Sequence, residues 1–176
     1  KKIYRLRVAE QIKQLASKDI DRDLLGPATR VGGTMIGTAK GPAADYVVGF
    51  EMATLEKSFE TLLSGRVVWG PVTAGQLCLV VTDDQFLRAF AADGSMKFEV
   101  KVPEGIPVGQ AVAEGNTIVV NGGISGWLIA VNSDSGQIIG RQDLGQPISA
   151  TPLMIGQRLL VPGVEGVVYI SQVPSN

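Results

Sequence analysis

From Gly26 onward, short apolar runs alternate with tight turns that contain glycine, asparagine or aspartate. The unit between residues 108 and 143 shows the pattern, with apolar or β-branched runs at 108–112, 117–120 and 128–131 and turns at 114–116, 121–123 and 135–136. Gly, Asn and Asp supply the backbone conformations that tight hairpins need. Strands this short, joined by such turns, predict small antiparallel sheets of four strands that must stack face to face.

This unit repeats along the chain. The turn glycines Gly75, Gly115 and Gly156 are 40 and 41 residues apart, and residues 26–38 match residues 70–82 at an interval of 44. A period of about 40–45 residues with short β-rich stretches is typical of propeller blades. We predict repeats at 27–62, 67–101, 108–143 and 148–171, with four strands in each of the first three and three strands in the last.

The last repeat lacks a fourth strand. Only residues 172–176 follow it, and Pro174 among them disfavours a ladder. Soluble proteins generally avoid a bare strand edge. We therefore expect either a small ring closed by an outside strand or, as the favoured alternative, part of a larger ring. The expected covers are residues 3–8 folded back as a strand, a second copy of the chain, or a part of the protein outside this sequence.

The first 25 residues differ in composition from the rest. They contain no Gly or Pro and carry seven of the 16 basic residues, whereas all 22 glycines and nine prolines lie from Gly26 onward. Apolar residues fall at roughly helical spacing, at Ile3, Leu6, Val8, Ile12 and Leu15. We predict an amphipathic helix over residues 3–17 within an N-terminal segment 1–25, followed by blades over 26–176. Because the first residue is Lys1, we expect a processed or excised piece.

A motif recurs where the third predicted strand meets the fourth. Residues 130–140 read A-V-N-S-D-S-G-Q-I-I-G. This resembles the segment A-L-D-x-x-T-G-K-x-x-W of the quinoprotein-like (PQQ-type repeat) β-propeller family, with Gly140 in the Trp place. Residues 49–59 and 89–98 follow the same pattern with Phe59 and Phe98 in that place. Trp is absent from every copy, which puts the family's usual Trp-docking contacts between blades in question.

The fold class that follows is all-β: a β-propeller of about four blades of four-stranded antiparallel sheet, possibly part of a larger propeller, behind a short N-terminal α-helix. Val80, Val119 and Leu160 are the predicted buried residues of the second strands. Hydrophobic residues make up 45% of the chain and charged residues 19%, as in a globular protein. A net charge of −1 and 6% aromatic residues give no case for nucleic acid, and no apolar run approaches the ~20 residues that cross a bilayer.

Candidate chemistry is sparse. The chain has no histidine, which removes the commonest general base and metal ligand. The acidic stretches 83–84 and 132–134 invite a calcium interpretation, but acids at turns are usually solvated, and a calcium loop needs six to eight oxygens around one point. The glycine-rich stretches 64–65 and 122–126 are followed by neither lysine nor helix, so they are not phosphate loops.

Three further residues receive structural roles. Cys78 lies in an apolar run and is predicted to be an inert core thiol. Trp69 and Trp127 are predicted to be buried between blades rather than to stack on a quinone. No catalytic, cofactor-binding or metal-ligating residue is therefore predicted, no cofactor is expected, and the chain is expected not to be an enzyme.

The function expected from these features is a non-catalytic scaffold that binds another protein or a second copy of itself. The family resemblance implies an extracytoplasmic bacterial setting, periplasmic or at the cell envelope. Two alternatives are kept. One is a ligand-sensing propeller joined to a signalling domain through the N-terminal helix. The other is a fragment of a quinone-dependent dehydrogenase whose site residues lie outside this sequence.

Overall fold

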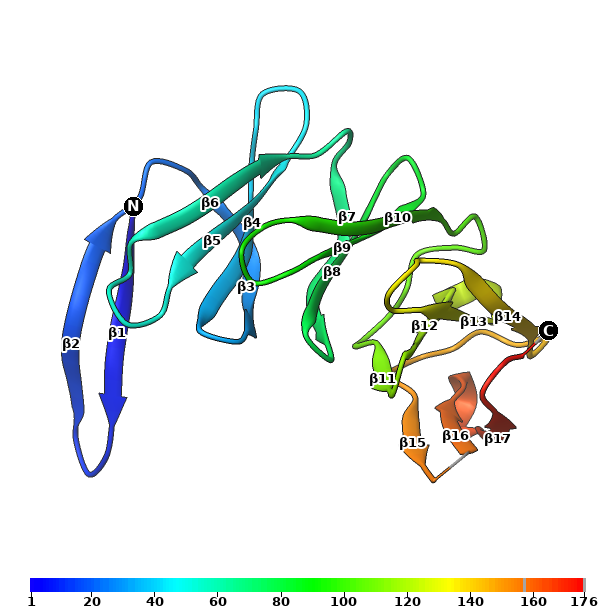
Figure 1. The fold of residues 1–176 in the computed structure, drawn as a ribbon. Helices are drawn as coiled ribbons and strands as arrows, with labels where there is room; N and C mark the ends of the chain where they lie inside the picture. Colours follow the sequence, from blue (N-terminus) through cyan, green and yellow to red (C-terminus); the bar gives the residue numbers. More distant parts are fainter. Residues whose placement is uncertain (157, 176) are drawn as a thin grey trace.

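The structure, a computed structural model, describes residues 1–156 and 158–175. It is all-β, as predicted, and its antiparallel sheets stand side by side along an open arc with the two termini at opposite ends (Figure 1). Within the described residues the sheets do not close into a ring. Over residues 1–156 and 158–175, three sheets have four strands, one has three and the N-terminal one has two.

The four larger sheets are called blades 1 to 4. Blade 1 consists of β3 (Leu24–Val31), β4 (Thr34–Ala39), β5 (Tyr46–Glu51) and β6 (Lys57–Leu62). Blade 2 consists of β7 (Val67–Ala74), β8 (Leu77–Thr82), β9 (Phe86–Phe90) and β10 (Met96–Lys101). Blade 3 consists of β11 (Val112–Glu114), β12 (Thr117–Asn121), β13 (Trp127–Asn132) and β14 (Ile138–Asp143). Blade 4 consists of β15 (Leu153–Ile155), β16 (Arg158–Pro162) and β17 (Val168–Gln172), and the short 3₁₀ turns η1 (Gly123–Ser125) and η2 (Val164–Gly166) precede the third strands of blades 3 and 4.

Each blade is a simple meander in which consecutive strands pair. The turn between the first and second strand holds a glycine in the left-handed region, with φ of 59° at Gly75, 54° at Gly115 and 58° at Gly156. A residue with a Cβ atom is disfavoured there. These glycines therefore set the hairpin positions that the sequence repeat predicts.

The second strands of blades 1 to 3 form the centre of the stack because both of their faces are covered. Leu79 packs with Ile118 of the following blade, whereas Cys78 and Val80 pack with Ile36 of the preceding one. All four of the side chains Ile36, Cys78, Leu79 and Val80 are fully buried. Burial on both sides explains why these strands read as continuous apolar runs instead of alternating ones.

The predicted core residues are confirmed in two cases of three. Val80 and Val119 are 0% exposed, and Val119 packs against blade 4. Leu160 is only half-buried, while its neighbours Leu159 and Val161 are the buried residues of β16. The reason is that Leu160 lies on the face of blade 4 that points away from blade 3, where the described residues place no further blade.

The predicted N-terminal helix is wrong. Residues 2–19 form a hairpin of β1 (Lys2–Val8) and β2 (Ile12–Asp19), drawn in blue in Figure 1. Ile3 is buried against blade 1, but Leu6, Val8, Ile12 and Leu15 are each about half or more exposed, so no apolar helical stripe exists. Charged and apolar residues alternate in Arg5-Leu6-Arg7-Val8, which is the period-two pattern of a strand. The roughly helical spacing of the apolar residues over the longer range 3–15 hid this pattern.

The hairpin has the register of the third and fourth strands of a blade. In blades 1, 2 and 3 the pairing of these strands contains one bulge, immediately after the pairs Gly49–Phe59, Ala89–Phe98 and Ala130–Gly140. In the hairpin the same irregularity follows the pair Arg5–Ala16. Bulges re-aim side chains and are specific features of a pairing. The hairpin is therefore the outer half of a blade-type sheet that stacks on blade 1.

Phe59 and Phe98 lie in contacts between successive blades. A Cβ atom on Gly94 of blade 2 would overlap the ring of Phe59 of blade 1, and one on Gly136 of blade 3 would overlap Phe98 of blade 2. We call each aromatic–glycine contact a latch. At the first junction the sizes are exchanged, since Ala16 stands in the aromatic place and the buried Leu55, with φ of 63°, stands in the glycine place.

The latch predicts that two similar glycine-to-alanine substitutions lower the free energy of unfolding by different amounts. Gly115→Ala places a Cβ in open space at a positive φ and is expected to cost about 1 kcal/mol of the free energy of unfolding. Gly94→Ala has the same backbone penalty, but its Cβ also meets the Phe59 ring, so we expect an additional loss of about 1–3 kcal/mol. Urea unfolding of the two variants measures the difference. Equal losses would show that the ring does not rest on Gly94.

Candidate interaction site

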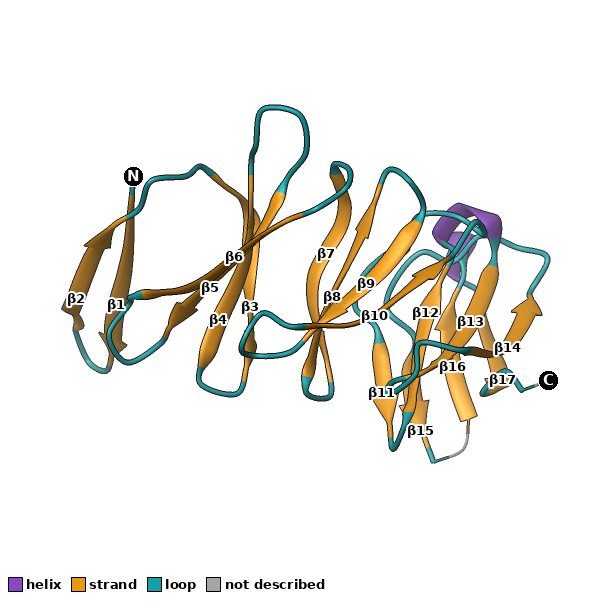
Figure 2. Cartoon of the chain, turned by 45° about the horizontal axis from the view of Figure 1, so that its top comes forward, coloured by secondary structure: helices purple, strands orange, loops and turns teal. Residues whose placement is uncertain are grey.

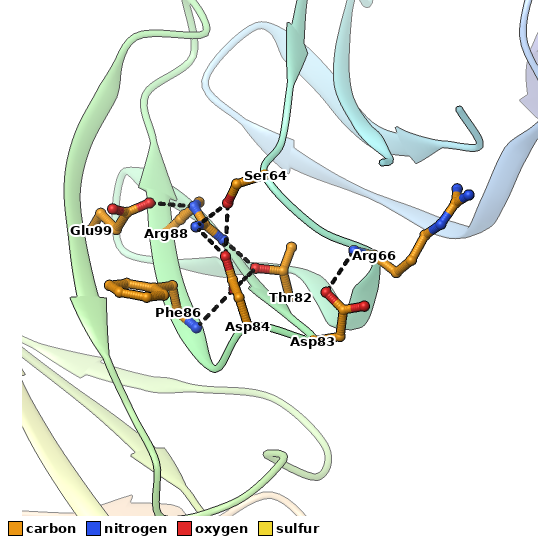
Figure 3. Close-up of polar contacts among 8 residues, drawn as sticks. All are labelled: Ser64, Arg66, Thr82, Asp83, Asp84, Phe86, Arg88 and Glu99. Atoms are coloured by element: carbon orange, nitrogen blue, oxygen red, sulfur yellow. Dashed lines mark hydrogen bonds and ion pairs between the residues drawn. The ribbon is translucent and has the colours of Figure 1, made fainter. Parts of the chain in front are cut away.

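The acidic turn at residues 83–84 is partly solvated, with Asp83 exposed and the Asp84 side chain 32% exposed, and both carboxylates also accept hydrogen bonds from the protein. The side chain of Arg88, only 5% exposed, reaches from β9 to Asp84 and Glu99, with Nη2 2.8 Å from Asp84 Oδ2 and Nε 2.5 Å from Glu99 Oε2 (Figure 3). Arg88 also donates to the hydroxyls of Ser64 and Thr82. The neighbouring carboxylate of Asp83 accepts from the backbone N–H of Arg66 at 2.9 Å.

This cluster is structural because every nitrogen of the Arg88 guanidinium already donates to a protein acceptor. An arginine has five N–H groups, and here Nε bonds Glu99, Nη1 bonds Thr82 and Asp84, and Nη2 bonds Ser64 and Asp84. The Arg88 guanidinium holds the pKa of Asp84 well below its usual range. The cluster joins the connection from blade 1 to three strands of blade 2, β8, β9 and β10, and leaves no donor of Arg88 for a ligand. Within the described residues no group of three His, Cys, Asp or Glu side chains could hold a metal ion.

A second buried carboxylate, Asp45, was not found from the sequence. It is 3% exposed and accepts from Arg66 Nη1 at 2.7 Å and from the backbone N–H of Val67 at 2.9 Å. Burial alone would raise the pKa of Asp45, but these hydrogen bonds outweigh it and keep the pKa below its usual value. Its partners lie more than 20 residues away, so no local motif marks the pair. This carboxylate also ties one blade to the next.

The remaining residues singled out in the sequence have mixed outcomes. Cys78 is 0% exposed and burial raises the pKa of its thiol to about 12, as expected of an inert core residue. Trp69 is buried between blades 2 and 3, where its indole N–H donates to the Gly109 carbonyl at 2.9 Å. Trp127 is only half-buried and belongs to no core cluster of described residues, so its predicted burial between blades is wrong.

The glycine-rich stretch 122–126 is a loop of blade 3 that carries η1. Its backbone closes on itself, with Ser125 N–H donating to Gly122 O and Gly126 N–H donating to Gly123 O, so it presents no free amide nest of the kind that binds phosphate. The side chain of Ile124, in the middle of this loop, is 85% exposed to solvent. A single exposed apolar residue is ordinary on a protein surface, so its neighbours decide whether it belongs to a contact surface.

Other exposed apolar side chains surround Ile124. We define the loop patch as four exposed apolar residues of the loops and connections of blades 2 to 4, together with Val68 at the start of β7: Val68, Ile106, Ile124, Val164 and Val167. Backbone contacts place these loops together, since Ile148 N–H donates to Gly123 O at 2.9 Å and Ile148 also bridges to Gly163. In Figure 2 the 3₁₀ turns, shown in purple, lie along one side of the arc.

A small hollow extends the loop patch toward blade 2. It has a volume of about 180 Å³ and is lined by Val68, Val81, Thr82, Asp83, Gln85, Gly105 and Ile106. A larger cleft of about 450 Å³ opens among the strand turns of blades 2 and 3, between Leu77, Lys97, Ile118 and Asp134. The hollow is too small for an ordinary cofactor, for which sites of about 300–1,000 Å³ are usual. Its apolar lining comes from Val68, Val81 and Ile106, and its polar lining from Thr82, Asp83 and Gln85.

Comparison with known proteins gives the fold but no family. No protein-family model matches the chain, and no curated protein matches it. Among solved structures it is similar to BamB from Moraxella catarrhalis, with a TM-score of 0.69 and 11% identity over 91% of this chain and 56% of that one. It is also similar to the computationally designed Ika4 protein, with a TM-score of 0.64 and 8% identity over 89% of this chain and 94% of that one. A third similar structure is BBS1N in complex with ARL6DN, with a TM-score of 0.61 and 13% identity over 93% of this chain and 57% of that one.

These likenesses show that the chain consists of β-propeller blades. The chain spans a little more than half the length of the BamB and BBS1N chains that it matches. In the described part of the chain, no helix is long and apolar enough to cross a membrane.

Proposed function

We propose that this chain is a non-catalytic β-propeller scaffold that binds another protein through the loop patch. The observation that carries the proposal is the exposure of Ile124 and Ile106, at 85% and 54%, on ordered loops beside an apolar hollow. Apolar anchors that enter a partner's pocket dominate the energetics of protein interfaces. A scaffold needs such anchors on a rigid support, and the stacked blades supply one.

The polar residues of the chain support the same proposal. The charged clusters around Arg88 and Asp45 are satisfied internally and join one blade to the next, so they are unsuited to acid–base chemistry on a substrate. Asn121, which is 1% exposed, likewise has a structural role. Its side-chain amide accepts from the backbone N–H of Val108 and donates to the Val108 carbonyl, which fixes the loop there. We infer that these residues do not carry the chemistry of a quinoprotein site and that the blades serve as a platform for binding.

The repeat class and the setting are also part of the proposal. The motif at residues 130–140 favours PQQ-type repeats, and the latches at Phe59 and Phe98 give the motif its expected use between blades. The likeness to BamB and the repeat class together support an extracytoplasmic bacterial setting. BBS1N was solved in complex with ARL6DN, so one similar propeller is known with a bound protein.

Site-specific photo-crosslinking in the native cells tests the proposal. A photoreactive residue at Ile124 or Ile106 is expected to give one discrete adduct with a partner protein. Met96, which is 53% exposed at a strand turn outside the loop patch, is the matched control position. Adducts that form equally well from Met96, or none from Ile124 and Ile106 at equal protein level, would show that the loop patch is not the binding surface.

A further inference from the structure

The cleft among the strand turns of blades 2 and 3, which we call the turn cleft, is large enough for a small molecule. Its volume of about 450 Å³ lies within the range of about 300–1,000 Å³ that is usual for ligand sites. The β7–β8 and β11–β12 turns that border it lie on the opposite side of the arc from the 3₁₀ turns (Figure 2). The turn cleft shares no residue with the loop patch, so a ligand bound here is independent of the function proposed above.

The deepest residues of the turn cleft are apolar. Ala74 and Leu77 of blade 2 and Ile118 of blade 3 line it at 4%, 9% and 1% exposure. Gly75 and Gly115 stand at the two turns and carry no side chain that could cover this apolar floor. An apolar group that enters the cleft therefore loses contact with water and gains transfer free energy.

Two opposite charges from different blades line the same cleft. Lys97 comes from β10 of blade 2, and Asp134 comes from the β13–β14 turn of blade 3. Among the residues that the structure describes, neither of them forms an ion pair. The hydroxyl of Ser95 and, to a smaller extent, the charge of Lys97 lower the pKa of Asp93, but Asp93 Oδ1 already accepts from the Ser95 N–H and hydroxyl.

This availability distinguishes the turn cleft from the other polar clusters between blades. The guanidinium of Arg88 and the carboxylate of Asp45 are taken up by protein partners. The ammonium group of Lys97 has no hydrogen-bond acceptor over residues 1–156 and 158–175. A ligand can therefore recruit this cation without breaking a contact of the fold.

The carboxylate of Asp134 is held in place by the residues around it. Its Oδ2 accepts from Asn116 Nδ2 at 2.7 Å. The backbone N–H groups of Asp134 and Ser135 both donate to Asn132 Oδ1, at 3.0 and 2.9 Å, which fixes the turn that carries the carboxylate. A group that is already oriented loses little conformational entropy when it binds. Asp134 thus presents a fixed acceptor to a cation that enters the cleft.

We propose that the turn cleft binds a short apolar peptide, the size of a dipeptide, with both of its termini free. The ammonium group of the peptide pairs with Asp134, its carboxylate pairs with Lys97, and its side chains pack on Leu77 and Ile118. Charge-assisted hydrogen bonds at the two ends orient the ligand, and the apolar floor contributes to its affinity. A ligand with a charge of one sign only would leave the other charged wall without a partner beside an apolar surface.

The dipeptide Leu-Leu is the probe, in NMR titrations of the full chain. We expect saturable shifts at Leu77, Ile118 and residues 133–134. N-acetyl-Leu-Leu lacks the ammonium group and Leu-Leu amide lacks the carboxylate, so each should bind at least about tenfold more weakly through the loss of one charged hydrogen bond. Gly-Gly keeps both charges but has no apolar side chain, and it should not bind measurably. Free leucine, with one apolar side chain, should also bind more weakly than Leu-Leu.

Two variants assign each charge to its side chain. Lys97→Met removes the cation, so it should bind Leu-Leu and Leu-Leu amide equally well. Asp134→Asn removes the anion, so it should bind Leu-Leu and N-acetyl-Leu-Leu equally well. Both positions are exposed, so the fold is retained. Lys101→Met, at the other end of β10 and outside the cleft, is the matched control and should bind like the parent protein.

Several results would overturn the proposal. They are the absence of saturable shifts with Leu-Leu, equal binding of the acetylated or amidated peptide by the parent protein, and the same loss of binding in Lys101→Met as in Lys97→Met. Leucine that binds as tightly as Leu-Leu would assign the turn cleft to free amino acids and would also overturn it. None of these results bears on binding at the loop patch, which the crosslinking experiment tests separately.

Discussion

Val119→Asp is expected to abolish folding. Val119 is 0% exposed and lies among Leu128, Ala130, Leu159 and Val161, where blades 3 and 4 meet. An aspartate there would place a carboxylate in an apolar cluster without a hydrogen-bond partner, at a cost of several kcal/mol. That cost is comparable to the whole stability of an ordinary domain, about 5–15 kcal/mol. Circular dichroism during heating measures the effect.

The same substitution at an exposed residue is the control. Ile124→Asp changes a side chain that is 85% exposed, so we expect its melting temperature to stay within 2 °C or so of the parent protein, in line with a surface change of about ±0.5 kcal/mol. A soluble Val119→Asp protein with the parent's melting temperature would show that the register of β12, and with it the stacking of blades 3 and 4, is wrong.

Arg88→Met is expected to destabilise blade 2 by about 2–3 kcal/mol, because it removes the buried cation and leaves the carboxylates of Asp84 and Glu99 without a positive charge beside them. We place the loss at the lower end of what buried pairs show, since Asp84 and Glu99 are 32% and 38% exposed and can recover some hydration. Adding Asp84→Asn and Glu99→Gln removes the orphaned charges, so the triple variant should regain at least half of the loss. No recovery would mean that the methionine packs badly and that the charges are not the cause.

The pH dependence of unfolding separates these causes further. Arg88 lowers the folded-state pKa of Asp84 below its value of about 3.9 in an unfolded chain. The stabilisation that results is present above the unfolded pKa and is lost as the pH falls through the folded one. The parent protein should therefore lose stability between about pH 5 and pH 2, and Arg88→Met should lose less over the same range. Equal slopes in urea titrations would contradict this role for Arg88.

The blades could be predicted because their determinants are local and repeated. The apolar run of β8 and the turn at Gly75 lie in adjacent residues, and the same arrangement recurs around Gly115 and Gly156. The N-terminal strands could not be predicted in this way because the hairpin is one incomplete copy without glycine at its turn. Its exposed residues Ile12 and Leu15 are three residues apart, as on one face of a helix, although the pairing that decides the structure is the bulged register at Arg5 and Ala16.

The polar clusters show a different limit of sequence reasoning. Asp84 looks like an ordinary turn residue until β9 brings Arg88 to it, and Asp45 meets Arg66 only because successive blades are adjacent. The loop patch is likewise assembled from three blades, so none of its residues is distinctive alone. The one available signal was Ile124, an isolated apolar residue in a glycine-rich loop.

Amide hydrogen exchange, measured residue by residue by NMR, tests the stack of blades most directly. We expect the slowest exchange in the second strands, at residues 78–81 and 118–120, which are covered on both faces. In residues 2–8 we expect every second amide to be protected, because β1 pairs on one side only. Continuous protection across residues 3–17, as in a helix, together with fast exchange at 118–120, would contradict the arrangement.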